Sequence, residues 1–237
     1  CAPSKFDGAR FTMAIGGILF DKDGTLLDFN ATWVPINRAA ARLVAGGDDN
    51  LAADLLRAGG QDDKACKVAP GSLLAASNTQ EIAACWAELA PNHGIDDLVG
   101  VMDALFQREG ARHAVAVDGL EPTIKRLNQR GLKLGIATSD SREGALATLS
   151  PFGILEYFDF IAGYDSGFGT KPGPGMVLGF AEATNLKPDE ILVIGDNHHD
   201  LEMGRNAGAG MLVGVLTGTS GREHLSDLAD HIVDSIT

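Results

Sequence analysis

The chain has 237 residues, 45% of them hydrophobic, so it is long enough to bury a full core and to carry an inserted module. Its formal net charge of −13 argues against nucleic acid and anionic membranes as partners, because both attract proteins through a positive field. No run of about 18 apolar residues is present, so we expect no membrane-spanning helix.

The first residues fit no element of the fold predicted below. We interpret 1–12 as a tag remnant or a disordered extension, with Met13 as the natural start. This segment has no basic stretch followed by an apolar block, which would indicate a secretory signal. Cys1, Cys66 and Cys85 lack metal-ligand spacing and are expected to be reduced thiols. We therefore expect a cytoplasmic protein.

The stretch 15–20 (IGGILF) predicts a short buried strand that runs directly into acidic residues. Asp21 and Asp23 follow it, and alternate side chains on an extended chain share a face, so both carboxylates can point at one ligand. Gly24 allows the chain to turn sharply. Paired carboxylates at the end of a buried strand favour a hard cation such as Mg²⁺, whereas the alternative is a solvated acidic turn.

The middle of the chain shows helical spacing and no convincing strand. Asn78 and Glu81 are spaced like a capping box at the start of one helix. A loop rich in glycine and charge, 59–72, separates the predicted helices. The apolar stripes that predict these helices lie within 33–44, 82–89 and 95–106.

From residue 116 onward, apolar strands alternate with helical patterns, which is typical of a parallel sheet covered on both faces. We predict an α/β fold: a doubly wound parallel-sheet (Rossmann-like) core with an inserted all-helical cap domain. The core would comprise 13–28 and 113–237, and the cap 29–112. The predicted strands are 15–20, 132–138, 158–163, 191–195, 211–215 and 231–233.

Two further sites could contact a phosphate group. Thr138 and Ser139 follow a buried strand, where hydroxyls and free backbone N–H groups at a helix N-terminus can hold phosphate oxygens. Simple capping of the next helix is the alternative. Lys171 lies in a loop fixed by glycines and prolines, 167–175, and could neutralise a transferring phosphoryl group or be an exposed loop lysine.

Another buried strand ends in Asp196, which could complete a cation site with Asp21. Asp200 lies near the start of a predicted helix, where it could cap the helix and orient a neighbouring side chain. His198 and His199 are adjacent and therefore point in different directions, so we expect solvated loop histidines rather than metal ligands.

In order and spacing, these four motifs resemble those of the haloacid dehalogenase-like hydrolase superfamily, and within it the phosphoglycolate phosphatase-like members. The resemblance covers 15–208, and the closing stretch 214–236 is also similar to the C-terminal end of phosphoglycolate phosphatases. It implies a doubly wound core with a helical cap inserted after the first motif. The family's lysine motif usually continues to an acidic residue, and this chain has Gly175 there.

The resemblance also implies roles by position. Asp21 corresponds to the nucleophile and Asp23 to the general acid/base. Thr138 corresponds to the phosphate-binding hydroxyl and Lys171 to the charge clamp. Asp196 corresponds to a ligand of Mg²⁺, which the family also binds through the side chain of Asp21 and the backbone carbonyl of Asp23.

We therefore expect a Mg²⁺-dependent phosphomonoester hydrolase that cleaves a small soluble, phosphoglycolate-like phosphate ester through a phospho-aspartyl intermediate on Asp21. A phosphosugar mutase shares every core motif and remains the alternative. We disfavour a receiver-type signalling domain, because such domains need no helical insertion. We also disfavour a dehalogenase, because dehalogenases lack an acidic residue at the position that Asp23 occupies in this chain. Arg38, Lys64 and Lys67 of the cap could reach the leaving group or be surface charges.

Overall fold

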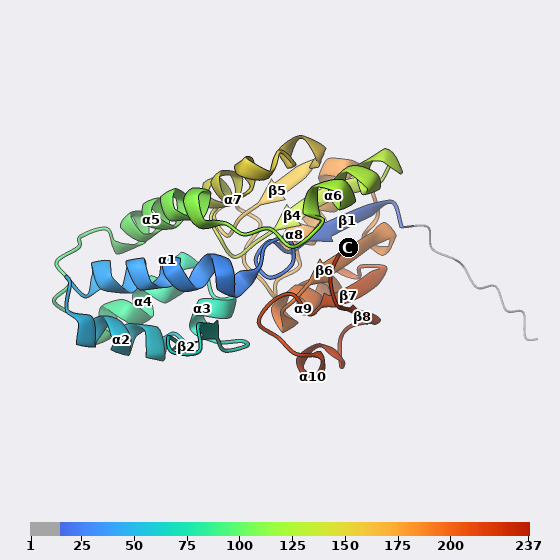
Figure 1. Ribbon diagram of the computed structural model, residues 1–237. Helices are drawn as coiled ribbons and strands as arrows, with labels where there is room; N and C mark the ends of the chain where they lie inside the picture. The colour runs from blue at the N-terminus through green and yellow to red at the C-terminus, as the bar shows by residue number, and fades with distance from the viewer. Residues whose placement is uncertain (1–14) are drawn as a thin grey trace, which may run out of the picture.

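The computed structural model describes residues 15–237, and the predicted extension at 1–12 lies outside the described residues. A sheet with helices around it forms one end of the molecule, and a group of helices forms the other (Figure 1). The chain leaves the first strand, builds the helical end, and returns to complete the sheet.

The sheet has six parallel strands in the order β5-β4-β1-β6-β7-β8, so the strand order reverses beside β1. Every predicted strand is present. This is the doubly wound arrangement expected from the sequence, and ligands in such sheets bind where the strand order reverses. The strands are β1 (Gly17–Phe20), β4 (Lys133–Ala137), β5 (Phe160–Ala162), β6 (Ile191–Gly195), β7 (Met211–Val215) and β8 (His231–Val233).

Both faces of the sheet are buried, which explains the near-continuous apolar strands. In β1, Ile18 and Phe20 belong to one hydrophobic cluster and Leu19 to another. The first cluster includes Ile124 of α6, and the second includes Phe180 of α8. The core helices are α6 (Leu120–Gln129), α7 (Arg142–Leu149), α8 (Gly175–Thr184), α9 (His198–Ala207) and α10 (Arg222–Leu225).

The helical end has a hydrophobic cluster of its own, centred on side chains such as Trp86 and Met102. Asn78 and Glu81 form the predicted capping box at the start of α4. The division of the chain at 29–112 stays a prediction, which this separate cluster supports. The cap helices are α1 (Phe29–Val44), α2 (Asp49–Ala58), α3 (Leu73–Ala76), α4 (Thr79–Leu89) and α5 (Leu98–His113).

The cap differs from the prediction in one detail. Within the predicted loop, β2 (Gln61–Asp62) pairs antiparallel with β3 (Lys67–Val68). Strands of two residues are too short to produce an alternating pattern, so the sequence gives no sign of them. The cap also contacts the core, because α5 packs on α7 (Figure 1).

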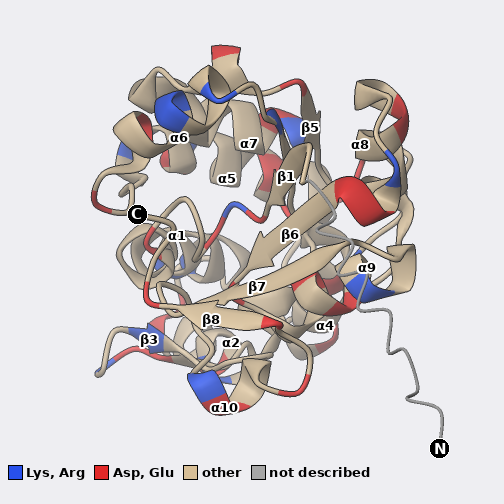
Figure 2. Ribbon diagram, turned by 90° about the vertical axis from the view of Figure 1, so that its right-hand side faces the viewer, with Lys and Arg blue, Asp and Glu red and all other residues tan. Residues whose placement is uncertain are grey.

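The basic residues that the structure describes do not form a patch that would attract nucleic acid or an anionic membrane. Figure 2 shows lysine and arginine scattered over the ribbon rather than gathered on one face. Cys66 and Cys85 are free thiols. Among residues 15–237, no helix is both long and apolar enough to cross a membrane.

Candidate active site

The strand register brings three of the predicted site residues to one edge of the sheet. Phe20 of β1 is in register with Ile136 of β4 and Ile194 of β6. Asp21, Thr138 and Asp196 therefore follow at the carboxyl ends of three neighbouring strands. A small cavity of about 60 Å³ lies between this edge and the cap, and all predicted site residues line it: Asp21, Asp23, Thr138, Ser139, Lys171, Asp196 and Asp200.

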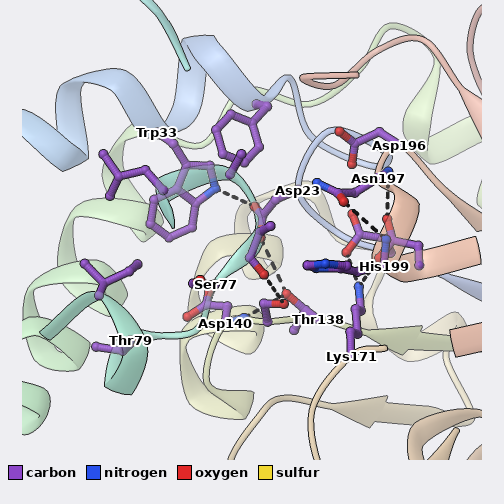
Figure 3. A pocket seen from close by; sticks show the side chains of 18 of the residues that line it. Asp23, Trp33, Ser77, Thr79, Thr138, Asp140, Lys171, Asp196, Asn197 and His199 are labelled. Carbon is purple, nitrogen blue, oxygen red and sulfur yellow. Dashed lines mark hydrogen bonds and ion pairs between the residues drawn. The ribbon is translucent and has the colours of Figure 1, made fainter. Parts of the chain in front are cut away.

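Lys171 lies between two buried carboxylates at the base of this cavity (Figure 3). Its Nζ atom is 2.6 Å from Oδ1 of Asp21 and 2.6 Å from Oδ1 of Asp200. The other oxygen of Asp21, Oδ2, is buried and has no hydrogen-bond partner among the described residues. Burial raises the pKa of Asp21 to about 7, although Lys171 acts in the opposite direction.

Asp200 makes the contacts that its predicted positioning role requires. Its Oδ2 accepts a hydrogen bond from the backbone N–H of Asn197 at 3.0 Å, which closes a capping box at the start of α9. Because its Oδ1 accepts from Lys171, the side chain ties the lysine to the end of a helix. A side chain at Gly175 would collide with the backbone oxygen of Phe168, so the family's acidic position cannot be filled here and Asp200 supplies the counter-charge.

Three buried carboxylates, those of Asp21, Asp196 and Asp200, have oxygens within 4.8 Å of one another. Burial raises the pKa of Asp196 well above its usual range, and the charges of Asp21 and Asp200 add to this effect. A hard divalent cation would offset both the desolvation and the repulsion. The free Oδ2 of Asp21 and the neighbouring carboxylate of Asp196 therefore fit Mg²⁺, while both oxygens of Asp200 already accept hydrogen bonds.

Gly24 lets the chain turn closely around Asp196. Its φ is +93°, a region that side chains other than glycine rarely adopt. A Cβ atom at this position would lie 2.6 Å from Cγ of Asp196. The glycine of the first motif is therefore needed both for its backbone conformation and for the space that Asp196 occupies.

Asp23 is held from three directions. Its Oδ1 accepts a hydrogen bond from Nε1 of Trp33 on the cap at 2.7 Å (Figure 3). Its Oδ2 lies 2.9 Å from Nζ of Lys22. The hydroxyl of Thr138 is 3.5 Å from the same Oδ2. A cap residue thus contacts one of the two aspartates of the first motif.

The sequence assigns no role to Lys22, although it lies between the two aspartates of the first motif and could supply a cation for a second substrate anion. In the structure Lys22 does not line the cavity. Its side chain is fully buried and lies 2.9 Å from carboxylate oxygens of Asp23 and Asp140. Burial alone would lower the pKa of Lys22, but the two carboxylates outweigh it and raise the pKa. The lysine therefore stays charged beneath the cavity.

The two histidines expected to be solvated differ in their surroundings. Both side chains are partly exposed, but His199 also lines the cavity, and its Nδ1 is buried with no hydrogen-bond partner among the described residues. Asn197 caps α9 by accepting from the backbone N–H of His199, whose ring lies beside Lys171 (Figure 3). No local pattern distinguishes the two adjacent histidines.

The three cap cations considered for the leaving group lie elsewhere. Arg38 is exposed and pairs with Asp63 at 2.6 Å. Lys64 and Lys67 are exposed on the β2–β3 segment. The cap residues that line the cavity are uncharged instead, and they are mostly apolar.

Known proteins resemble this chain in sequence and in fold. A family model described as haloacid dehalogenase-like hydrolase matches residues 15–208. Pyrophosphatase PpaX from Bacillus mycoides is 26% identical over 231 residues, covering 95% of each chain. A predicted phosphoglycolate phosphatase from Haemophilus somnus is 20% identical with a TM-score of 0.69, covering 95% of this chain and 96% of that one. CbbY from Rhodobacter sphaeroides in complex with phosphate is 21% identical with a TM-score of 0.67, covering 94% and 95%.

Proposed function

Because the chain belongs to the haloacid dehalogenase-like hydrolase family, we propose that it is a Mg²⁺-dependent phosphatase that hydrolyses a small soluble phosphate monoester through a covalent intermediate on Asp21. The observation that carries this proposal is the base of the cavity. There, Lys171 bridges Asp21 and Asp200, while the second oxygen of Asp21 is buried and free.

The first half of the reaction transfers the phosphoryl group to the protein. A carboxylate oxygen of Asp21 attacks phosphorus, the ester P–O bond breaks, and the leaving oxygen takes a proton from Asp23. Lys171 is fixed beside the nucleophile and offsets charge on the transferring group. When bound by Asp21, Asp196 and the backbone carbonyl of Asp23, Mg²⁺ supplies further charge neutralisation.

The second half returns the protein to its starting state. Asp23 removes a proton from a water molecule, the water oxygen attacks phosphorus, and the bond to Asp21 breaks to release inorganic phosphate. Thr138 and Ser139 both line the cavity, and their hydroxyls would hold phosphate oxygens. The cap excludes bulk water around these groups.

The test is release of inorganic phosphate from a panel of phosphate esters, measured with and without Mg²⁺. We expect turnover to vanish in chelator and to return with Mg²⁺, and Asp21→Asn to abolish it while the circular dichroism spectrum is unchanged. Asp189→Asn, at an exposed aspartate far from the cavity, is the matched control and should keep full activity. Turnover by Asp21→Asn, or full activity in chelator after dialysis, would refute the proposal.

A phosphosugar mutase would return the phosphoryl group to a sugar instead of to water. The same assay separates the two, because a mutase isomerises a hexose phosphate without net release of phosphate. Steady release of phosphate from an ester supports the hydrolase.

A further inference from the structure

The cavity has a marked division of chemistry between its two walls. Its ionisable residues, including Lys171 and His199, all come from the core. The wall formed by the cap is apolar except for three uncharged polar residues, Asn37, Ser77 and Thr79. The apolar residues of that wall include Phe29, Trp33, Leu74, Ile82 and Phe106.

The cap has cations, but none of them reaches the cavity. Each lysine and arginine of α1 to α5 and of the loops between them is exposed, and none lines the cavity. These side chains are Arg38, Arg42, Arg57, Lys64, Lys67, Arg108 and Arg112. In the proposed reaction the leaving group faces the cap, and it therefore meets no lysine or arginine of the cap among the described residues.

The two buried lysines of the core, Lys171 and Lys22, are already engaged. Lys171 contacts Asp21 and Asp200, and Lys22 lies behind the cavity between Asp23 and Asp140. Phosphate and the carboxylates of this floor more than balance Lys171 and one divalent cation. A second anion on the substrate would be desolvated against a wall whose described residues offer no cation, only the uncharged polar groups of Asn37, Ser77 and Thr79, which is unfavourable.

The uncharged wall is suited to a different leaving group. The rings of Trp33 and Phe106 pack edge to face with centroids 5.4 Å apart, which gives a fixed apolar surface. The polar atom of Trp33 is engaged by Asp23, so this ring offers the leaving group only its apolar surface. Ser77 and Thr79 offer hydroxyls that can bind an uncharged hydroxyl group.

We infer that the cavity selects phosphate monoesters of small uncharged alcohols and discriminates against substrates with a second anion, including 2-phosphoglycolate and inorganic pyrophosphate. This inference rests on the proposed function. It differs from the phosphoglycolate-like substrate that the sequence resemblance implies, because Arg38, Lys64 and Lys67, which were considered for the leaving group, do not line the cavity.

The test compares kcat/KM for three substrates with the full chain and Mg²⁺: 2-hydroxyethyl phosphate, 2-phosphoglycolate and inorganic pyrophosphate. The first two differ mainly in that a hydroxymethyl group replaces a carboxylate. We expect kcat/KM for 2-hydroxyethyl phosphate to exceed that for each of the other two substrates by at least about tenfold. The reason is that burying a charge without a counter-charge costs more free energy than a tenfold ratio represents. Equal values, or a preference for 2-phosphoglycolate or inorganic pyrophosphate, would overturn the inference.

A charge introduced on the cap wall provides a second readout. Lysine and methionine have similar lengths, but only lysine is charged. The ratio of kcat/KM for 2-hydroxyethyl phosphate to that for 2-phosphoglycolate should therefore be severalfold smaller in Ser77→Lys than in Ser77→Met. The same preference in both variants would show that the cap wall does not set selectivity. If no substrate, including p-nitrophenyl phosphate, is hydrolysed with Mg²⁺ present, the proposed function itself fails.

Discussion

Gly24 is the residue at which backbone conformation and site geometry are most directly linked. Gly24→Ala introduces a side chain at a φ of +93° and within 2.6 Å of Cγ of Asp196. We expect kcat to fall by at least about tenfold, because displacement of a catalytic group by a fraction of an ångström has effects of this size. The measurement is steady-state kinetics at saturating Mg²⁺.

Gly131→Ala is the control for this prediction. Gly131 has a φ of +80°, but a Cβ atom there would meet nothing within 4 Å. Both variants should lose about 1 kcal/mol of unfolding free energy through backbone strain. Equal losses of activity in the two variants would contradict the proposed link between Gly24 and Asp196.

Lys22 gives a second prediction at the residue scale. Lys22→Met leaves the carboxylates of Asp23 and Asp140 without their buried cation. We expect the free energy of unfolding to fall by about 3 kcal/mol, because an unpaired buried charge is costly. Urea unfolding at neutral pH measures it. Lys133→Met, which breaks a half-exposed pair with Asp159, should cost less than about 1 kcal/mol, and a similar cost for both would refute the prediction.

At the scale of elements, α1 links the cap to the chemistry. Asp28 caps its first turn, and Trp33 then reaches back to Asp23. Trp33→Phe keeps the aromatic ring and removes the N–H donor. Asp23 would be less well positioned to protonate a poor leaving group, so kcat should fall about tenfold for an alkyl phosphate.

The same change should matter far less for p-nitrophenyl phosphate, whose leaving group needs no proton. Trp86→Phe is the control, since Trp86 is fully buried in the cap and does not line the cavity. It should lower stability without changing the ratio of the two rates. The same ratio in Trp33→Phe as in the unmodified protein would show that the contact with Asp23 has no catalytic effect.

The sequence predicts some elements of the structure better than others. The six strands and the residues directly after them could be predicted, because buried apolar runs that end in polar groups are a local signal. The β2–β3 pair was missed because it is too short. Lys22, His199 and the contact of Trp33 with Asp23 depend on packing between segments far apart in the chain, which no local pattern records.

At the scale of the whole molecule, two hydrophobic units close on one cavity. The core supplies the charged groups and the cap supplies an uncharged wall. The two are also joined away from the cavity, where the hydroxyl of Tyr164 donates to Asp103 of α5 at 2.7 Å. Packing of α5 on α7 adds to this connection. The cap is thus held over the residues to which catalysis is assigned.

The central claim is that Asp21 becomes phosphorylated, and a single-turnover trap tests it most directly. In Asp23→Asn the second half of the reaction lacks its base, so mixing with p-nitrophenyl phosphate and Mg²⁺ should release one equivalent of p-nitrophenolate and then stop. Borohydride reduction followed by mass spectrometry should then find homoserine at position 21. A burst with the modification at any other residue, or continued turnover without one, would contradict the account.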